Sequence, residues 1–263
     1  MEAFLLLKPD CLRLGLTREV DRAVAWAGLR AECRHAVELT PGDTRFLWSE
    51  YTEDGHVLTR ALLDRYLCDG PSEVLRLRGP GAFEAARQIK REIRSRYAMG
   101  PFANVVHAAE RPGELARQGD HLGGRCAACS APFPAVPGRN PPRPAGFDFR
   151  DTADIPGLVA VVWPRLSDES PPPPYRLDDV APVAALHLGA DRDHTLDSAV
   201  TAVWRALSGV DLADAVMLTL WAGRTGDQPI ATGSREAVEK SYRVLLDHGV
   251  RACGTGPYTL LGC

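Results

Sequence analysis

The chain has 263 residues, of which 45% are hydrophobic and 25% are charged, as in ordinary soluble globular proteins. This composition excludes disordered, collagen-like and coiled-coil chains. A formal charge of -3 provides no overall positive field that would hold nucleic acid or an anionic membrane. At roughly 100 to 200 residues per domain, we expect about two domains.

The apolar runs of the chain are far shorter than the roughly 20 residues needed to cross a membrane. Met1 leads directly into a strand-like segment at 3–7, so we expect no signal peptide. Seven cysteines are an odd number in a chain too large to need a disulfide framework. We therefore expect a cytoplasmic protein with reduced thiols, with neither a membrane nor a nucleic acid as partner.

Strand and helix patterns alternate in the first half of the chain. The predicted strands are 3–7, 29–39 and 73–77, and the predicted helices are 17–27, 43–51, 57–67 and 81–96. This alternation is typical of a sheet covered by helices. The predicted fold class is therefore α/β, in the wider sense that includes α+β.

Two proline-rich stretches interrupt this pattern. Six prolines fall within 132–144, and because proline fixes φ and removes a backbone donor, we expect no helix or central strand to cross that segment. Four consecutive prolines within 167–174 predict a loop in the polyproline conformation. We predict a first domain at 1–120, a proline-rich linker at 121–150 and a second domain at 151–263.

A second set of elements follows the linker. The predicted strands are 158–163, 183–188, 250–253 and 258–261, and the predicted helices are 195–207, 212–221 and 234–246. Ser234 is expected to cap the last helix, with Glu236 and Glu239 near the positive end of its dipole.

Three short motifs occur in order in the first domain. They are Leu-Leu-Lys-Pro-Asp at 6–10, Tyr-Leu-Cys-Asp-Gly-Pro at 66–71 and Asn-Val-Val-His at 104–107. Together they resemble the motifs of nucleoside diphosphate kinases, and the resemblance covers about residues 1–118. The resemblance implies a ferredoxin-like fold for this domain.

A histidine among basic residues suits phosphoryl transfer on chemical grounds alone. A neutral imidazole, with an ordinary pKa near 6.5, can attack a terminal phosphorus and form a phosphohistidine. The reaction then needs cations around the phosphate oxygens, usually with Mg²⁺ bridging the nucleotide phosphates. Arginine suits this task because its planar fork makes bidentate contacts with phosphate.

The resemblance assigns roles to six polar side chains. They are His107 as the nucleophile, Lys8, Arg87 and Arg94 as phosphate ligands, and Tyr51 and Asn104 as residues that position the nucleotide. It also implies ATP as the donor, Mg²⁺ as the cofactor and a nucleoside diphosphate or related molecule as the acceptor. The alternative is a non-catalytic adaptor that senses a nucleotide and binds a peptide or protease through its second domain.

The chain departs from the family pattern in three places. The segment between Arg87 and Arg94 is shorter, so the loop that supports trimer contacts is expected to be missing, and a homodimer is favoured over the family's hexamer. Thr59 replaces a base-stacking phenylalanine, which predicts weaker base binding. The glutamate that orients the imidazole has no clear match, and Gln118 and Glu114 are the candidates.

A cysteine pair lies in the predicted linker. Cys126 and Cys129 have the spacing of half a zinc site, and His121 lies close enough to be a third ligand. The other cysteines are scattered along the sequence, so the second half of such a site is not evident. The alternatives are a structural zinc site, a redox pair and two loop thiols without a special role.

The last third of the chain resembles ClpS, the adaptor of the Clp protease that recognises N-terminal degrons, over residues of about 183–263. The matching segments are 191–207, 216–221 and 234–239. The resemblance implies a ClpS-like α/β domain with an N-terminal extension.

The resemblance to ClpS also implies a site for a free α-amino group. Asp191 would accept from the amine, and the side chains that would form an apolar socket beside it are Leu196, Met217 and Leu220. Ala190 replaces the family's asparagine and Trp221 its histidine, so two polar contacts are lost and weak peptide binding is expected. The alternative is a small α/β module that packs against or docks a partner.

Overall fold

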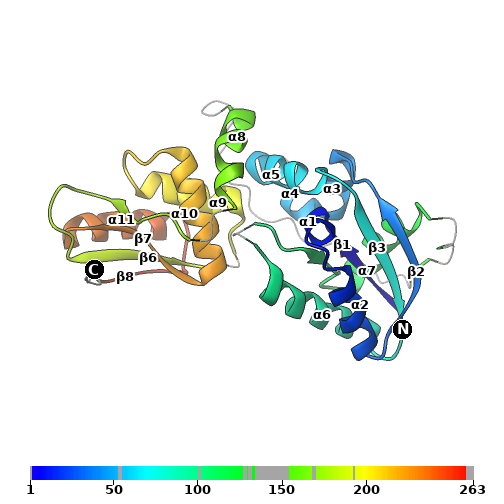
Figure 1. The fold of residues 1–263 in the computed structure, drawn as a ribbon. Coiled ribbons are helices and arrows are strands. Elements are labelled where there is room, and N and C mark those ends of the chain that lie inside the picture. Colours follow the sequence, from blue (N-terminus) through cyan, green and yellow to red (C-terminus); the bar gives the residue numbers. More distant parts are fainter. Residues whose placement is uncertain are drawn as a thin grey trace. The chain divides into compact units, whose positions relative to one another are not determined.

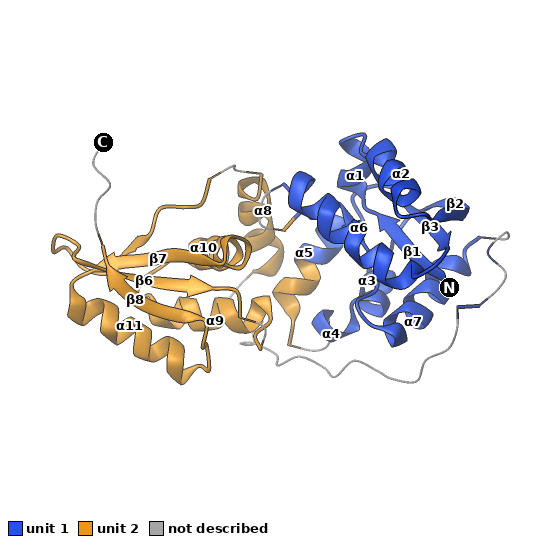
Figure 2. Ribbon diagram, turned by 90° about the horizontal axis from the view of Figure 1, so that it is seen from below, with its two compact units in different colours: residues 1–52, 62–99, 103–142 blue, residues 53–61, 100–102, 143–263 orange. Residues whose placement is uncertain are grey.

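The structure is a computed structural model that describes residues 2–52, 55–99, 102–126, 129, 132–133, 154–167, 170–191 and 193–258. The chain divides into two compact units (Figure 2). Unit 1 consists of residues 1–52, 62–99 and 103–142, and unit 2 of residues 53–61, 100–102 and 143–263. None of the described helices has the length and apolar character needed to cross a membrane.

Unit 1 contains a four-stranded sheet (Figure 1). Its strands are β1 (Glu2–Leu7), β2 (Arg30–Val37), β3 (Ser72–Arg78) and β4 (Val106–His107). Their order is β2-β3-β1-β4, and every neighbouring pair is antiparallel. This order, with helices between β1 and β2 and between β3 and β4, is the ferredoxin-like topology, and the predicted fold class is confirmed.

The helices of unit 1 cover both faces of its sheet. They are α1 (Pro9–Arg13), α2 (Thr17–Trp26), α3 (Pro41–Leu47), α4 (Ser49–Thr52), the second half of α5 (Val57–Leu67), α6 (Ala82–Tyr97) and α7 (Pro112–Gly123). Residues 57–61 of α5 belong to unit 2. Because side chains alternate along a strand, Leu5 and Leu7 of β1 join the core formed with α2 and α6. Phe4 points to the other face, where it lies near His107 and Phe133, and α7 packs there.

The predicted helix at 43–51 forms as two helices. Thr40 and Asp43 form a capping box at the start of α3, with Pro41 in the first turn. The backbone leaves the helical conformation at Trp48, with φ of -118° and ψ of 43°, and α4 follows. The break separates Tyr51 from the first helix and places it on a short turn of its own.

Unit 2 contains a second four-stranded sheet. Its strands are β5 (Tyr175–Arg176), β6 (Ala184–Gly189), β7 (Asp227–Gly233) and β8 (Cys253–Pro257), in the order β5-β7-β6-β8. Its helices are α8 (Ile155–Arg165), α9 (Leu196–Ala206), α10 (Leu212–Thr225) and α11 (Arg235–Asp247). The core lies between the sheet and α9, α10 and α11, with Leu186, Leu188 and Ile230 buried in it.

The strand predicted at 158–163 is wrong, because this segment lies in α8. Its valines favour a strand, but a short apolar run has no period that separates a strand from a helix. Pro156 in the first turn is compatible with a helix start, and Val159 and Val162 are buried at helical spacing. The strand predicted at 250–253 is displaced along the sequence, because the observed strand, β8, begins at Cys253 and ends at Pro257. Of the strand predicted at 258–261, residues 259–261 lie outside the described residues.

Asp197 of α9 caps the first turn of α5 within unit 2. Its carboxylate accepts hydrogen bonds from the backbone N–H of Leu58 at 2.9 Å and of Thr59 at 3.0 Å, and also from the Thr59 hydroxyl. The side chain is fully buried. These backbone donors belong to the four that an α-helix leaves without internal partners.

We expect Asp197→Ala to lower the free energy of unfolding by about 2 kcal/mol, because buried N–H groups lose a charged acceptor. Urea unfolding of the full chain, followed by circular dichroism, measures the change. Asp179→Ala is the control, since Asp179 is exposed in a loop of the same unit. Equal midpoints for the two variants would show that the Asp197 cap contributes no stability.

Candidate functional site

The site in unit 1 is built around His107, the second residue of β4. The strand pairs with β1 through Leu6 opposite His107 and Leu7 opposite Val106. Val105, just before it, is fully buried and has φ of 53°, in the left-handed region that a valine rarely adopts. Strain of this kind persists only where surrounding contacts impose it, and such residues cluster at functional sites.

Asp10 and Tyr66 impose this backbone conformation. The Tyr66 hydroxyl donates to Asp10 Oδ2 at 2.8 Å, and the Val105 N–H donates to the same oxygen at 3.1 Å. The Asn104 N–H donates to the Tyr66 hydroxyl oxygen at 2.9 Å. Burial raises the pKa of Tyr66, and the Asp10 carboxylate raises it further, so the phenol keeps its proton. The three sequence motifs therefore meet in one buried network that holds the loop before His107.

Gln118 of α7 fixes the tautomer of the imidazole. The Gln118 side-chain amide donates to the Leu47 carbonyl at 2.6 Å, so its Oε1 faces His107 Nε2 at 2.8 Å. An amide oxygen only accepts, so Nε2 carries the ring proton. The lone pair is therefore on Nδ1, the nitrogen that can act as a nucleophile.

Gln118, and not Glu114, is the residue that orients the imidazole. Glu114 Oε2 instead accepts from the Glu110 N–H at 2.6 Å and the Arg111 N–H at 3.3 Å at the start of α7. The structure also shows why an amide suits position 118. A carboxylate there would place an oxygen against the Leu47 carbonyl, and neither group could donate.

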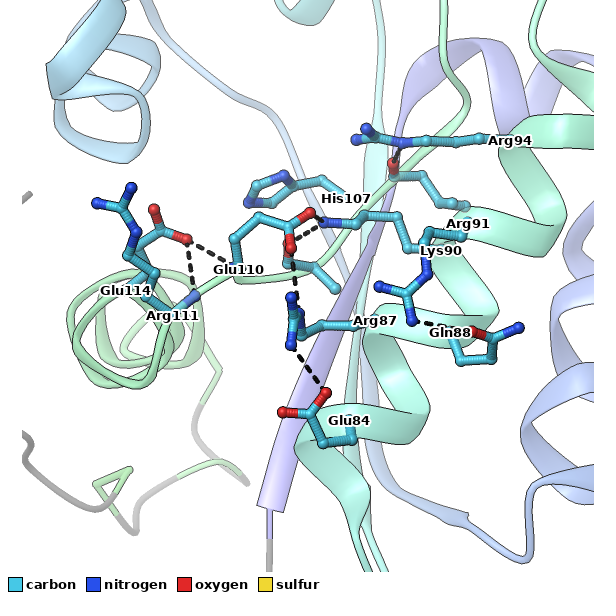
Figure 3. A network of polar contacts seen from close by, with 12 residues as sticks. Glu84, Arg87, Gln88, Lys90, Arg91, Arg94, His107, Glu110, Arg111 and Glu114 are labelled. Atoms are coloured by element: carbon cyan, nitrogen blue, oxygen red, sulfur yellow. Dashed lines mark hydrogen bonds and ion pairs between the residues drawn. The ribbon is translucent and has the colours of Figure 1, made fainter. Parts of the chain in front are cut away.

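Three cations approach β4, one from Lys8 just after β1 and two from α6. Lys8 Nζ donates to Asn104 Oδ1 and lies 5.0 Å from the centre of the Tyr66 ring. On α6, Lys90 Nζ donates to the Ala108 carbonyl at 3.0 Å, and Arg94 Nε donates to the Val106 carbonyl at 2.9 Å (Figure 3).

The sequence-based prediction of phosphate ligands did not include Lys90. Its position four residues before Arg94, which places both side chains on the same face of α6, would have indicated it. Because it is buried and its ammonium contacts the backbone beside His107, it belongs with Lys8 and Arg94. We call these three residues the cation cluster.

Burial and positive charge keep the imidazole neutral. Burial lowers the pKa of His107 well below 6.5, and the positive charges of Lys8, Arg94 and Lys90 lower it further. Burial also lowers the pKa of each member of the cation cluster, and the charge of Arg94 adds to the effect on both lysines. Such a concentration of positive charge favours binding of an anion.

Arg87 lies on the same helix, three residues before Lys90, and forms ion pairs with two carboxylates. It donates to Glu84 at 2.8 Å and to Glu110 at 3.1 Å, and Glu110 also accepts from Lys90 (Figure 3). Glu110, followed by Glu84, raises the pKa of the Arg87 guanidinium. A phosphate at Arg87 would therefore compete with two carboxylates.

Aromatic and polar residues complete the surroundings of the site. Trp48, which sequence reasoning did not single out, lies with its ring 5.0 Å from the His107 ring. Tyr51 lies on α4, half-buried, and interacts electrostatically with Arg94. Thr59 belongs to unit 2 and is not part of these surroundings; it is buried, and its hydroxyl is bonded to Asp197.

The residues of unit 2 that were predicted to bind the N-terminal amine of a peptide fall into two groups. Asp191, Leu196 and Leu220 line a cavity of about 320 Å³. Met217 and Trp221 are buried on α10 and do not line this cavity. Both Asp191 oxygens already accept backbone N–H groups, Oδ1 from Asp193 and Oδ2 from Arg251 and Ala252.

The predicted cysteine pair meets different partners from those expected. Cys126 and Cys129 lie beside Cys33 and His35 of β2. His121 is not part of this group, because its Nε2 lies 2.8 Å from Asp43 Oδ1 and its ring stacks on Phe46 at 4.2 Å.

No family model matches the chain. It is 30% identical over 124 residues to the nucleoside diphosphate kinase of Mycobacteroides abscessus, covering 43% of this chain and 89% of the relative. It is 26% identical over 125 residues to that of Ignicoccus hospitalis, covering 44% of this chain and 83% of the relative.

Two solved structures are also similar to it. The nucleoside diphosphate kinase of Aquifex aeolicus matches with 20% identity and a TM-score of 0.36, over 43% of this chain and 88% of that one. An NDP kinase from Pyrobaculum aerophilum matches with 21% identity and a TM-score of 0.34, over 44% and 92%. By the sequence relatives, the chain belongs to the nucleoside diphosphate kinase family over about its N-terminal two fifths.

Proposed function

We propose that unit 1 transfers the γ-phosphate of ATP through a phosphohistidine at His107 to a nucleoside diphosphate or a related acceptor. The observation that carries the proposal is the buried imidazole, with its proton held on Nε2 by Gln118 and the cation cluster around it. A neutral Nδ1 needs no general base, because it has no proton to lose before attack.

The chemical steps follow from this arrangement. Nδ1 attacks the γ-phosphorus, the bond from that phosphorus to the β–γ bridging oxygen breaks, and ADP leaves with the electron pair. A terminal oxygen of the acceptor diphosphate then attacks the phosphohistidine, and the N–P bond breaks to restore the imidazole. The hydrogen bond to Gln118 keeps the ring in one orientation through both steps.

The cation cluster stabilises the charge that moves in these steps. Lys8, Lys90 and Arg94 surround an imidazole that is itself neutral, so an incoming phosphate relieves their mutual repulsion. In a buried site these charges act more strongly than in water and need no reorganisation during the reaction. Tyr51 and Asn104 are proposed to position the nucleotide.

Mg²⁺ would be bound mainly by the nucleotide. The carboxylates near the cation cluster in the described part of the chain are already engaged, Asp10 by Tyr66 and Val105, and Glu110 by Lys90 and Arg87. Mg²⁺ prefers oxygen ligands and commonly binds through substrate phosphates. It would supply charge neutralisation along the phosphate chain.

A second candidate function is nucleotide binding without transfer. The pairing of Arg87 with Glu84 and Glu110 favours it, because it removes a free phosphate ligand from the proposed site. In this case unit 2 would act as the docking module of an adaptor. The place proposed for a peptide or protein is the cavity lined by Asp191, Leu196 and Leu220, where the Asp191 oxygens already accept backbone N–H groups.

We expect incubation with γ-labelled ATP and Mg²⁺ to give an acid-labile, base-stable phosphoprotein. His107→Asn should lose the label, because no other described imidazole lies within the cation cluster. His248→Asn is the control, since His248 is exposed in unit 2. An unlabelled wild type that binds ATP would support the adaptor function, and a labelled His107→Asn protein would contradict our proposal.

We expect the His107 ring to remain neutral as the pH falls through 6.5, because its pKa is lowered well below that value. Lys8→Met removes a positive charge near the ring and should raise its pKa, so protonation begins at higher pH. NMR titration of the ring, with the signal assigned from His107→Asn, measures both effects. A ring that titrates near 6.5 in the wild type would contradict the buried, neutral imidazole.

We expect Gln118→Leu to slow phosphohistidine formation by roughly 10-fold to 100-fold, by analogy with the loss of partners that orient metal-binding histidines. The ring would lose the acceptor that selects its tautomer, while ATP affinity should change little. Rapid-quench labelling and calorimetry separate the two quantities. Gln88→Leu, on the exposed face of α6, is the control, and equal rates for both variants would exclude the orienting role of Gln118.

A further inference from the structure

Four potential metal ligands converge away from the His107 site. Cys33 and His35 are two residues apart on β2, so their side chains leave the same face of the strand. Cys126 and Cys129 follow the end of α7. The three sulfur atoms and one imidazole nitrogen all lie within 4.8 Å of one another.

The distances are close to those of tetrahedral zinc. Zn–S bonds of about 2.3 Å and Zn–N bonds of about 2.0–2.1 Å place two sulfurs about 3.8 Å apart and a sulfur and a nitrogen about 3.6 Å apart. Cys33 Sγ lies 3.3 Å from Cys126 Sγ and 3.6 Å from His35 Nδ1. The remaining pairs of ligand atoms lie within 4.8 Å of each other, so shifts of up to about 1 Å would bring the four atoms to the spacing of a zinc site.

His35 Nε2 forms the kind of hydrogen bond that metal-binding histidines make through their other ring nitrogen. His35 Nε2 lies 3.2 Å from the Leu122 carbonyl oxygen, which only accepts, so Nε2 carries the proton. The lone pair is then on Nδ1, which faces Cys33. Metal-bound histidines commonly donate their other N–H to a carbonyl or carboxylate in this manner.

The backbone between the two later cysteines is also arranged for chelation. The Cys129 N–H donates to the Cys126 carbonyl at 3.0 Å, and both thiols lie in the same cluster of ligand atoms. The Cys126 N–H donates to the Gly123 carbonyl at 3.0 Å, so this turn continues directly from α7. Cys-X-X-Cys turns of this kind supply half of many structural zinc sites.

We propose that Cys33, His35, Cys126 and Cys129 bind one Zn²⁺ in a closed tetrahedral Cys₃His site. The three thiols release their protons to solvent on binding, and the neutral imidazole contributes its Nδ1 lone pair. Four protein ligands leave no open position for a substrate, so the site is structural and not catalytic.

The ion would connect two parts of unit 1 that are also joined by the hydrogen bond between His35 and the Leu122 carbonyl. β2 lies at one edge of the sheet, and the Cys126–Cys129 turn follows α7. Because α7 carries Gln118, a metal at its end would brace the helix that orients His107. This inference does not depend on phosphotransfer, since zinc can be bound whether or not the imidazole is phosphorylated.

The experiment is zinc analysis of the full chain, purified under reducing conditions without chelator. We expect about one zinc per chain, and none in the double variant Cys126→Ser/Cys129→Ser. The matched control is Cys68→Ser/Cys253→Ser, which removes two thiols outside the cluster and should keep the metal. A wild type that remains free of zinc after reconstitution, or a control that loses it equally, would overturn the proposal.

Three further measurements keep the proposal testable if the double variant does not fold. Cobalt substitution of the wild type should give the intense visible bands of tetrahedral thiolate coordination, and octahedral spectra would contradict the site. Mass mapping of thiols distinguishes zinc ligands from a Cys33–Cys126 disulfide, which would also overturn it. A chelator should lower the melting temperature of the wild type and of the control.

Discussion

The hydrogen bond between His107 Nε2 and Gln118 Oε1 is the interaction on which the candidate site depends. It determines which ring nitrogen carries the lone pair, and it exists because Leu47 holds the amide of Gln118 in one orientation. Three elements therefore act together, with α3 orienting the amide, α7 carrying it and β4 presenting the ring. A displacement of any of them would change the tautomer or the direction of Nδ1.

The second constraint is the burial of positive charge beside the imidazole. Lys8 contacts Asn104 and two aromatic rings, and Arg94 donates to a backbone carbonyl. Glu110 forms an ion pair with Lys90, and Asp10 acts on Lys8 and Arg94 through its negative charge. Because burying charge is costly unless it is paired, these carboxylates offset part of the cost of holding three cations near a neutral imidazole.

One continuous helix carries several of the basic residues. Arg87 and Arg94 both lie on α6, and Lys90 falls between them on the same face. Arg94 and Lys90 reach the backbone on either side of His107, whereas Arg87 reaches Glu110 and Glu84. A regular helix therefore provides the cations here, and the carboxylate of Glu110 connects the outer arginine with the buried lysine.

Local patterns in the sequence determined most of the helices and strands and the α/β class, because these depend on periodicity and turn residues. The ferredoxin-like topology and the histidine with its neighbouring motifs were implied by the resemblance of three short motifs to those of nucleoside diphosphate kinases. Tertiary structure alone decided that Gln118 orients the ring, that Lys90 joins the cation cluster and that His35, not His121, lies with the cysteines. Each of these contacts joins residues that the fold brings together from separate elements. The helix at 155–165 belongs with them, since its apolar run has no period of its own and packing chose its conformation.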